Sequence, residues 1–138
     1  MLLQIKDKRD SDYIIFEYKL NKKQQSWCYY NQLGFVIIKA VKLGVDLSKA
    51  KLWRANLSGA DLSGAILTSA DLSEAKLIGA NLGEADLRWA DLTSADVRGA
   101  DLSRAKLIGV DLFNAVYNED TTFPKLRMGM IFRGESND

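Results

Sequence analysis

The fold is decided by residues 45–116, which read VDLSK AKLWR ANLSG ADLSG AILTS ADLSE AKLIG ANLGE ADLRW ADLTS ADVRG ADLSR AKLIG VDLFN AV. The first position of each group of five is Ala in 13 of 15 cases between residues 45 and 115. The third position is Leu in 13 of 14 cases between residues 47 and 112, and the second is mostly Asp or Asn. An internal repeat this regular predicts a solenoid, in which each unit buries its apolar residues against its neighbours.

A period of five residues fits neither a straight helix nor a flat strand. On an α-helix five residues advance by about 500°, so successive Leu side chains would lie about 140° apart. On a strand an odd period would send them to opposite faces. We therefore expect one bend per repeat, with Ala, Asp and Leu pointing in, out and in, and the last two residues turning a corner. A type II turn requires positive φ at the fifth position, which favours glycine there. Five repeats have glycine at this position, namely Gly59, Gly64, Gly79, Gly99 and Gly109.

These residues resemble the pentapeptide-repeat family, whose motif is A(D/N)LXX. The resemblance covers about residues 45–117. It implies an all-β fold, a right-handed quadrilateral parallel β-helix with four repeats per coil, and a bacterial, often cyanobacterial, origin. Residues 45–117 would then form about 3.6 coils.

The sequences on either side of the repeat suggest caps for the exposed ends of such a solenoid. We expect residues 1–34 to be a flanking segment with a strand at 13–20, and residues 35–44 to be a short helical cap that ends near Gly44. Residues 118–138 are expected to form a C-terminal cap and a frayed tail. The apolar residues available to that cap are Tyr117, Phe123, Leu126, Met128, Ile131 and Phe132.

The composition argues against several classes of function. The 138 residues include 19 Lys and Arg against 18 Asp and Glu, a net charge of +1, so nothing favours a nucleic-acid or membrane partner. The chain has no His and only one Cys, Cys28, which removes the commonest general base and the usual zinc ligands. We expect no enzymatic activity, no cofactor and no metal site, and a cytoplasmic location, since the first residues carry charges where a secretory signal would be apolar.

The acidic second positions allow two interpretations. Residues 20 apart should stack, so Asp71, Asp91 and Asp111 would form a column that could bind a cation. We favour local bonding of these side chains to the backbone, because the position is acidic throughout the repeat. Some family members bind DNA gyrase as DNA mimics, and a topoisomerase regulator is our alternative function. The repeat carries a charge of only −2, with basic residues on outward positions, which disfavours mimicry.

Several large apolar residues occupy outward positions that the repeat does not need to fill. Ile66, Trp89 and Ile108 would share one face of a four-sided solenoid, and Trp53 and Phe113 the next. Such a cluster is either covered by residues 1–34, or an interface with another chain, or scattered exposure. The leading hypothesis is a non-enzymatic structural and protein-interaction module. Its partner is an unidentified protein or a second copy in a homodimer, and the candidate interaction face is Trp53, Ile66, Trp89, Ile108 and Phe113.

Overall fold

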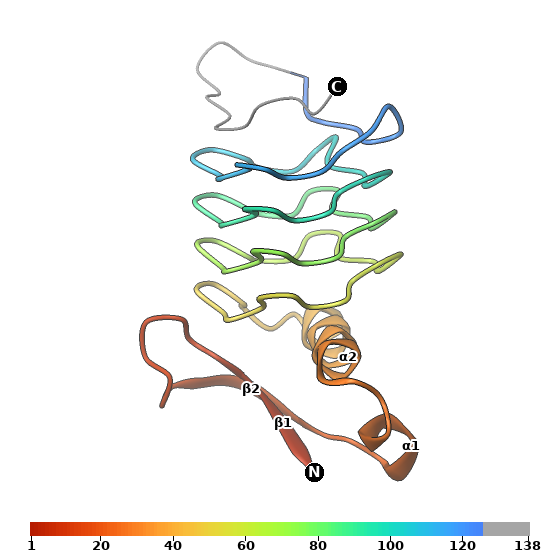
Figure 1. The fold of residues 1–138 in the computed structure, drawn as a ribbon. Helices are drawn as coiled ribbons and strands as arrows, with labels where there is room; N and C mark the ends of the chain where they lie inside the picture. Colours follow the sequence, from red (N-terminus) through yellow and green to blue (C-terminus); the bar gives the residue numbers. More distant parts are fainter. Residues whose placement is uncertain (126–138) are drawn as a thin grey trace.

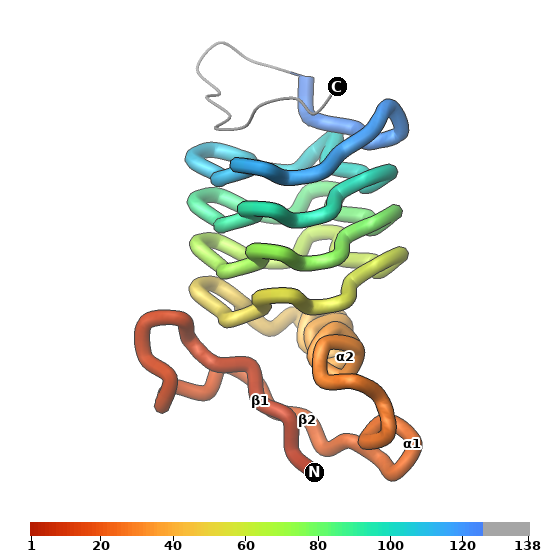
Figure 2. Tube along the Cα trace, in the orientation of Figure 1, coloured from red at the N-terminus to blue at the C-terminus, as the bar shows by residue number. Residues whose placement is uncertain are grey.

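The computed structural model describes residues 1–125, in which a small N-terminal unit leads into a stack of coils (Figure 1). The N-terminal unit contains an antiparallel hairpin of β1 (Leu2–Lys6) and β2 (Ile14–Lys19), followed by the short helix α1 (Lys22–Gln25) and the longer helix α2 (Tyr29–Lys42). The strand expected at residues 13–20 is therefore present as β2. Figure 2 shows the coils lying one above another, with the N-terminal unit beneath the first of them.

The coils are joined by parallel backbone pairing between residues that are twenty apart. Asp71 pairs with Lys51 on one side and with Asp91 on the other. The Asp71 N–H donates to the Ala50 carbonyl at 2.9 Å, and the Leu52 N–H donates to the Asp71 carbonyl at 2.8 Å. Twenty residues are four pentapeptides, so every repeat lies directly beside the repeat four places along the chain, in the pattern of a parallel ladder.

The interior of the stack is built from the first and third positions of the repeat. Every Ala at the first position and every Leu or Val at the third is buried, and Leu82 and Leu87 have no exposed surface. The second position is exposed or half-buried throughout. The in, out, in order expected from the sequence is thus confirmed, and the Leu column supplies most of the apolar burial.

The fifth position turns the corner with a left-handed backbone. Its φ is positive in 13 of 14 repeats, and this includes all five glycines expected there. Eight of these residues carry side chains, although a left-handed conformation costs an L-residue about 1–2 kcal/mol. A ladder hydrogen bond helps to offset the strain, since the fifth-position N–H donates to the next coil, as from Ser69 to the Arg88 carbonyl at 2.8 Å. The eight are Lys49, Arg54, Ser69, Glu74, Glu84, Trp89, Ser94 and Asn114.

Helix α2 begins at Tyr29, so the expectation that it would start at Phe35 was wrong. The helix continues through Gly34. Glycine usually weakens a helix, but at this position it lets the helix backbone approach the first coil. A Cβ atom at Gly34 would lie only 1.9 Å from the Asn56 carbonyl oxygen. The N-cap residue Cys28 makes no side-chain hydrogen bond to the helix. Gln32 holds the start of the helix, because its side-chain amide donates to the Trp27 carbonyl at 2.8 Å.

The N-terminal unit forms hydrogen bonds with the outer edge of the first coil. The Lys51 N–H donates to the Lys6 carbonyl at 2.7 Å, and the Lys8 N–H donates to the Lys49 carbonyl at 2.7 Å. On another side of the coil the Asn56 N–H donates to the Tyr30 carbonyl at 3.1 Å. Strand β1 and helix α2 therefore supply backbone partners that a coil below would otherwise supply.

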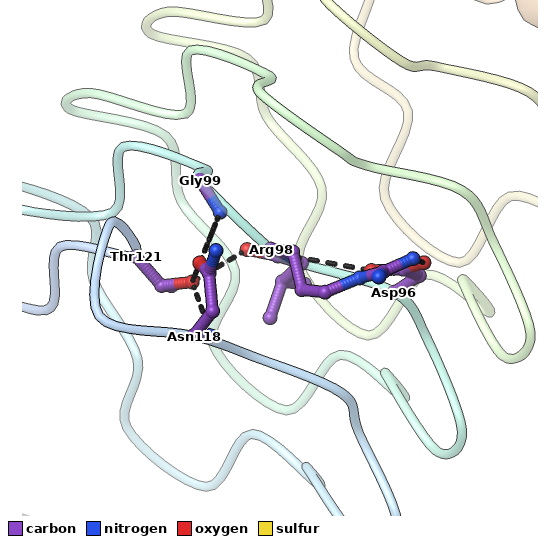
Figure 3. A network of polar contacts seen from close by, with 6 residues as sticks. Asp96, Arg98, Gly99, Asn118 and Thr121 are labelled. Atoms are coloured by element: carbon purple, nitrogen blue, oxygen red, sulfur yellow. Dashed lines mark hydrogen bonds and ion pairs between the residues drawn. The ribbon is translucent and has the colours of Figure 1, made fainter.

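At the other end the ladder continues past one inserted residue. Asp101 pairs with Thr122, twenty-one residues away instead of twenty. Side-chain oxygens now replace a backbone carbonyl, because the Gly99 N–H donates to Asn118 Oδ1 at 2.8 Å and to Thr121 Oγ1 at 3.1 Å (Figure 3). The Thr121 hydroxyl in turn donates to the Val97 carbonyl at 3.0 Å. Of the expected cap residues, Tyr117 and Phe123 meet edge to face, with ring centroids 5.7 Å apart, whereas Leu126, Met128, Ile131 and Phe132 lie outside the described residues.

Candidate interaction surface

The Asp and Asn side chains at the second position bond to their own repeat. The Asp71 Oδ1 accepts the backbone N–H of Ser73 at 3.1 Å and its hydroxyl at 2.5 Å, and Asp91 Oδ1 accepts the Thr93 N–H at 2.9 Å. The same bond to the residue two places on recurs at Asp46, Asn56, Asp61, Asn81, Asp86, Asp96, Asp101 and Asp111. These are Asx turns, so the local interpretation of the acidic column is confirmed. Within residues 1–125 no three His, Cys, Asp or Glu side chains are grouped so that they could hold a metal ion.

Arginine side chains neutralise part of the remaining acidic surface. Arg88 Nη2 lies 2.7 Å from Asp86 Oδ2, and its Nε also donates to Asp86 at 2.8 Å, which lowers the pKa of Asp86 to about 2. Arg98 makes the same two contacts with Asp96 and lowers the pKa of that carboxyl. Pairs twenty residues apart link neighbouring coils, as between Arg104 and Glu84 at 2.9 Å. The outward face is therefore a mosaic of both charges.

Trp89 and Ile108 are the most exposed large apolar residues on the described coils. The Trp89 side chain is 63% exposed and that of Ile108 is 56% exposed. The two residues are adjacent, because the Trp89 N–H donates to the Ile108 carbonyl at 2.9 Å. One face of the indole covers Gly109, where an added Cβ atom would lie 2.2 Å from the ring. The indole thus rests on the next coil and presents its other surface outward.

The other three candidate residues are more dispersed. Ile66 is 42% exposed and pairs with Asp86, the second residue of the repeat that ends at Trp89. Ile66 and Trp89 therefore share a face but lie at opposite ends of it. Trp53 and Phe113 belong to one column, but two intervening coils separate them, since the ladder bonds run through Ser73 and Thr93. The structure therefore brings Trp89 and Ile108 together and leaves Phe113 apart from Trp53.

Trp53 is partly covered by the N-terminal unit. The Tyr30 ring meets it edge to face at 5.9 Å, and the Arg54 guanidinium lies 4.4 Å above its ring centroid. The pKa of Arg54 is raised, first by a hydrogen bond with Tyr30 and then by Glu74, which it contacts at 2.7 Å. Tyr30 was not singled out from the sequence, because nothing in residues 24–33 shows which aromatic faces the first coil. Cover by residues 1–34 is thus correct for Trp53 and incorrect for Trp89 and Ile108.

A model of the pentapeptide repeat matches residues 46–83 and 80–116, with eight copies of the motif. The chain belongs to the pentapeptide-repeat family. Pentapeptide-repeat proteins fold as right-handed β-helices and are generally structural or interaction modules with diverse roles. No curated protein matches the chain.

Three solved structures of pentapeptide-repeat proteins are similar in sequence to this chain. Rfr23 from the cyanobacterium Cyanothece 51142 is 34% identical over 55% of this chain and 58% of its own, with a TM-score of 0.36. A protein of the Arabidopsis thaliana thylakoid lumen is 32% identical over 57% of this chain and 58% of its own, with a TM-score of 0.34. The protein alr5209 from Nostoc PCC 7120 is 31% identical over 72% of this chain and 93% of its own, with a TM-score of 0.36. This pentapeptide-repeat protein therefore spans 58% of the length of the first two. Neither helix within residues 1–125 has the length and hydrophobicity of a bilayer-spanning segment.

Proposed function

We propose that this chain is a non-enzymatic structural and protein-interaction module that binds a protein partner through Trp89 and Ile108. The observation that carries the proposal is the 63% exposure of Trp89 on a backbone fixed by ladder hydrogen bonds. Tryptophan is enriched among the residues that dominate the free energy of protein–protein association. A large apolar side chain that is already positioned loses little conformational entropy when a partner covers it.

The surroundings of Trp89 support a protein partner. Arg88 and Lys106 lie on the same face, and both contact Asp86, at 2.7 and 3.6 Å. An apolar centre with a charged rim is the usual composition of a protein interface. No insertion interrupts the repeat between residues 45 and 115, so the face is a regular wall without an inserted loop that could fold over it.

The test compares Trp89→Ser with Tyr13→Ser, a matched control. Tyr13 is 62% exposed and belongs to the hairpin loop, so both changes remove an exposed aromatic ring. Immobilised wild-type protein should retain a partner from the native cell that Trp89→Ser loses and Tyr13→Ser keeps, with all three proteins melting within a few degrees of one another. Equal retention by Trp89→Ser would contradict the proposed contact surface.

Three structural details form part of the same proposal. We infer that the β-helix has about 3.6 coils over residues 45–117, that the N-terminal unit caps its first coil, and that residues 118–125, the described part of the expected C-terminal cap, cover its last. The hydrogen bonds from Lys6 and Tyr30 support the first cap, and those of Thr121 and Asn118 support the second. A cytoplasmic location and a bacterial origin remain predictions from the sequence.

Regulation of gyrase by DNA mimicry is the weaker alternative. Duplex DNA carries about one charge per 1.7 Å of axis, whereas residues 45–117 contain eight basic and ten acidic residues. The ion pairs of Asp86, Asp96, Glu74 and Glu84 interrupt the acidic columns further. We expect no inhibition of gyrase supercoiling at micromolar protein, and a dose-dependent block would favour the alternative.

A further inference from the structure

Strand β2 has one edge without a backbone partner among residues 1–125. The Leu20 N–H donates to the Met1 carbonyl at 2.9 Å, which makes these two a hydrogen-bonded pair, and such pairs alternate along an antiparallel ladder. Glu17 and Lys19 take the alternate positions, so their N–H and C=O groups point away from β1. Both residues are exposed, and none of the described backbone hydrogen bonds uses these groups.

The position of the hairpin leaves this edge open. Strand β1 lies between β2 and the first coil, since the Lys6 carbonyl accepts the Lys51 N–H. Helix α2 covers one face of the hairpin, where the Tyr18 and Phe35 rings meet at 5.7 Å. The Glu17 side chain lies on the other face, where it accepts a hydrogen bond from the Gln4 amide at 3.3 Å. An exposed strand edge of this kind is a template for pairing with another strand.

We propose that β2 pairs with β2 of a second copy of this chain, antiparallel and two-fold symmetric about Tyr18. In this register Glu17 lies opposite Lys19 of the second copy, and Lys19 lies opposite Glu17 of the second copy. Their outward groups form four backbone hydrogen bonds, and two cross-strand pairs of opposite charge stabilise the same contact. A two-fold centred on Glu17 or on Lys19 would place like charges opposite each other, so the charge sequence selects the register about Tyr18.

The contact is small, and the dimer is therefore expected to be reversible. Two short strands bury far less surface than a standard interface of about 1,600 Å², so the assembly depends on concentration. It lies on the N-terminal unit and leaves Trp89 and Ile108 on the solenoid free for a different partner. The dimer and the proposed contact at Trp89 can therefore be tested separately.

The experiment measures molar mass by light scattering coupled to size-exclusion chromatography, at loaded concentrations from about 10 μM to about 1 mM. Wild-type protein should shift from monomer toward dimer across this range. Glu17→Lys and Lys19→Glu should each raise the dissociation constant about tenfold, because both cross-strand pairs become repulsive. The double variant Glu17→Lys with Lys19→Glu should restore dimerisation, since opposite charges face each other again. Lys22→Glu on α1, a matched charge reversal outside β2, should leave the dissociation constant unchanged.

A backbone variant tests the hydrogen bonds themselves. Lys19→Pro removes an outward N–H without removing a bond to β1, and proline is tolerated on an edge strand. It should weaken the dimer more than Lys19→Ala, which loses the same charge and keeps the N–H, while circular dichroism shows that both remain folded. The proposal is overturned if the wild type stays monomeric at about 1 mM, or if the single charge reversals leave a dimer intact. It is also overturned if the double variant fails to restore the dimer, or if Trp89→Ser abolishes it.

Discussion

Leu82 in the solenoid and Gly34 in helix α2 are both buried, but their surroundings differ in how often they recur. Leu82 belongs to a column of buried Leu residues, with Leu62 and Leu102 at the equivalent positions of the neighbouring coils. Gly34 makes a single close approach to another part of the backbone, the Asn56 carbonyl, and no other described glycine has a backbone atom so near. The solenoid is thus stabilised by repetition of one contact, and the N-terminal unit by a few contacts that each occur once. A substitution should act on neighbouring coils in the first case and on one junction in the second.

The largest effect is expected in the Leu column. Leu82→Asn would bury an amide without hydrogen-bond partners and leave a void, and should lower the free energy of unfolding by about 3 kcal/mol or more. Chemical denaturation monitored by circular dichroism measures it. Ile78→Asn is the matched control, because Ile78 is 39% exposed on an outward position and its replacement should be nearly neutral. Equal midpoints for the two variants would contradict the inward assignment.

The junction should be sensitive to a single methyl group. Gly34→Ala places a Cβ atom where the Asn56 carbonyl lies, and should cost about 1–3 kcal/mol although Ala favours a helix over Gly. We expect faster amide hydrogen exchange in β1 and α2 and unchanged exchange around Leu82. Gly83→Ala is the solenoid counterpart. Its Cβ atom would meet only the Asn81 side chain, at 3.1 Å, and should be tolerated. If Gly34→Ala instead stabilised α2, the close approach would be wrong.

Smaller changes in the free energy of unfolding, opposite in sign to each other, are expected at two corners of the solenoid. Gly64 and Ser69 both have left-handed backbones, with φ of +66° and +58°. Gly64→Ala should cost about 1 kcal/mol, since the site is open but the conformation is unfavourable for Ala, and Ser69→Gly should stabilise by up to about 1 kcal/mol. Thermal melts of both variants test this. Destabilisation by both would mean that the hydroxyl of Ser69 matters more than its φ.

The smallest effect concerns charge on the solenoid surface. The Asp86 pKa of about 2 lies below its ordinary value of 3.8, mainly because of the hydrogen bond from Arg88. A depressed pKa contributes stability above pH 3.8 that is lost as pH falls through about 2. Arg88→Ala should move the Asp86 pKa toward 3.8, with little change in melting temperature at neutral pH because solvent screens the half-exposed Arg88. Carboxyl-carbon NMR titration measures it. Asp61, whose pKa is lowered by Ser63 on another face, serves as an internal control.

The sequence predicts the solenoid well because each pentapeptide repeats the same pattern of buried and turn-forming residues. A buried Leu and a small Ala recur in almost every repeat and an Asx turn recurs in most, and together these local requirements are compatible with one fold. The helix start at Tyr29 was missed because Gly34 has meaning only beside Asn56, a partner that comes later in the chain. Likewise the sequence placed Trp89 and Ile108 on one face, but it could not show that Tyr30 covers Trp53 alone, since that depends on how α2 docks.

The Asx turns have a consequence for how such a surface can change over evolutionary time. In most repeats the corner is closed by an acidic or amide side chain of the same repeat, as Asp91 bonds to the Thr93 N–H. The fourth residue of a repeat contributes mainly backbone atoms to the fold, so its side chain can be exchanged without altering the corner. Every such position also lies on a lattice, with vertical steps near the strand spacing of about 4.8 Å. Mutation can therefore change the surface one side chain at a time, while the backbone pairing between coils keeps its register.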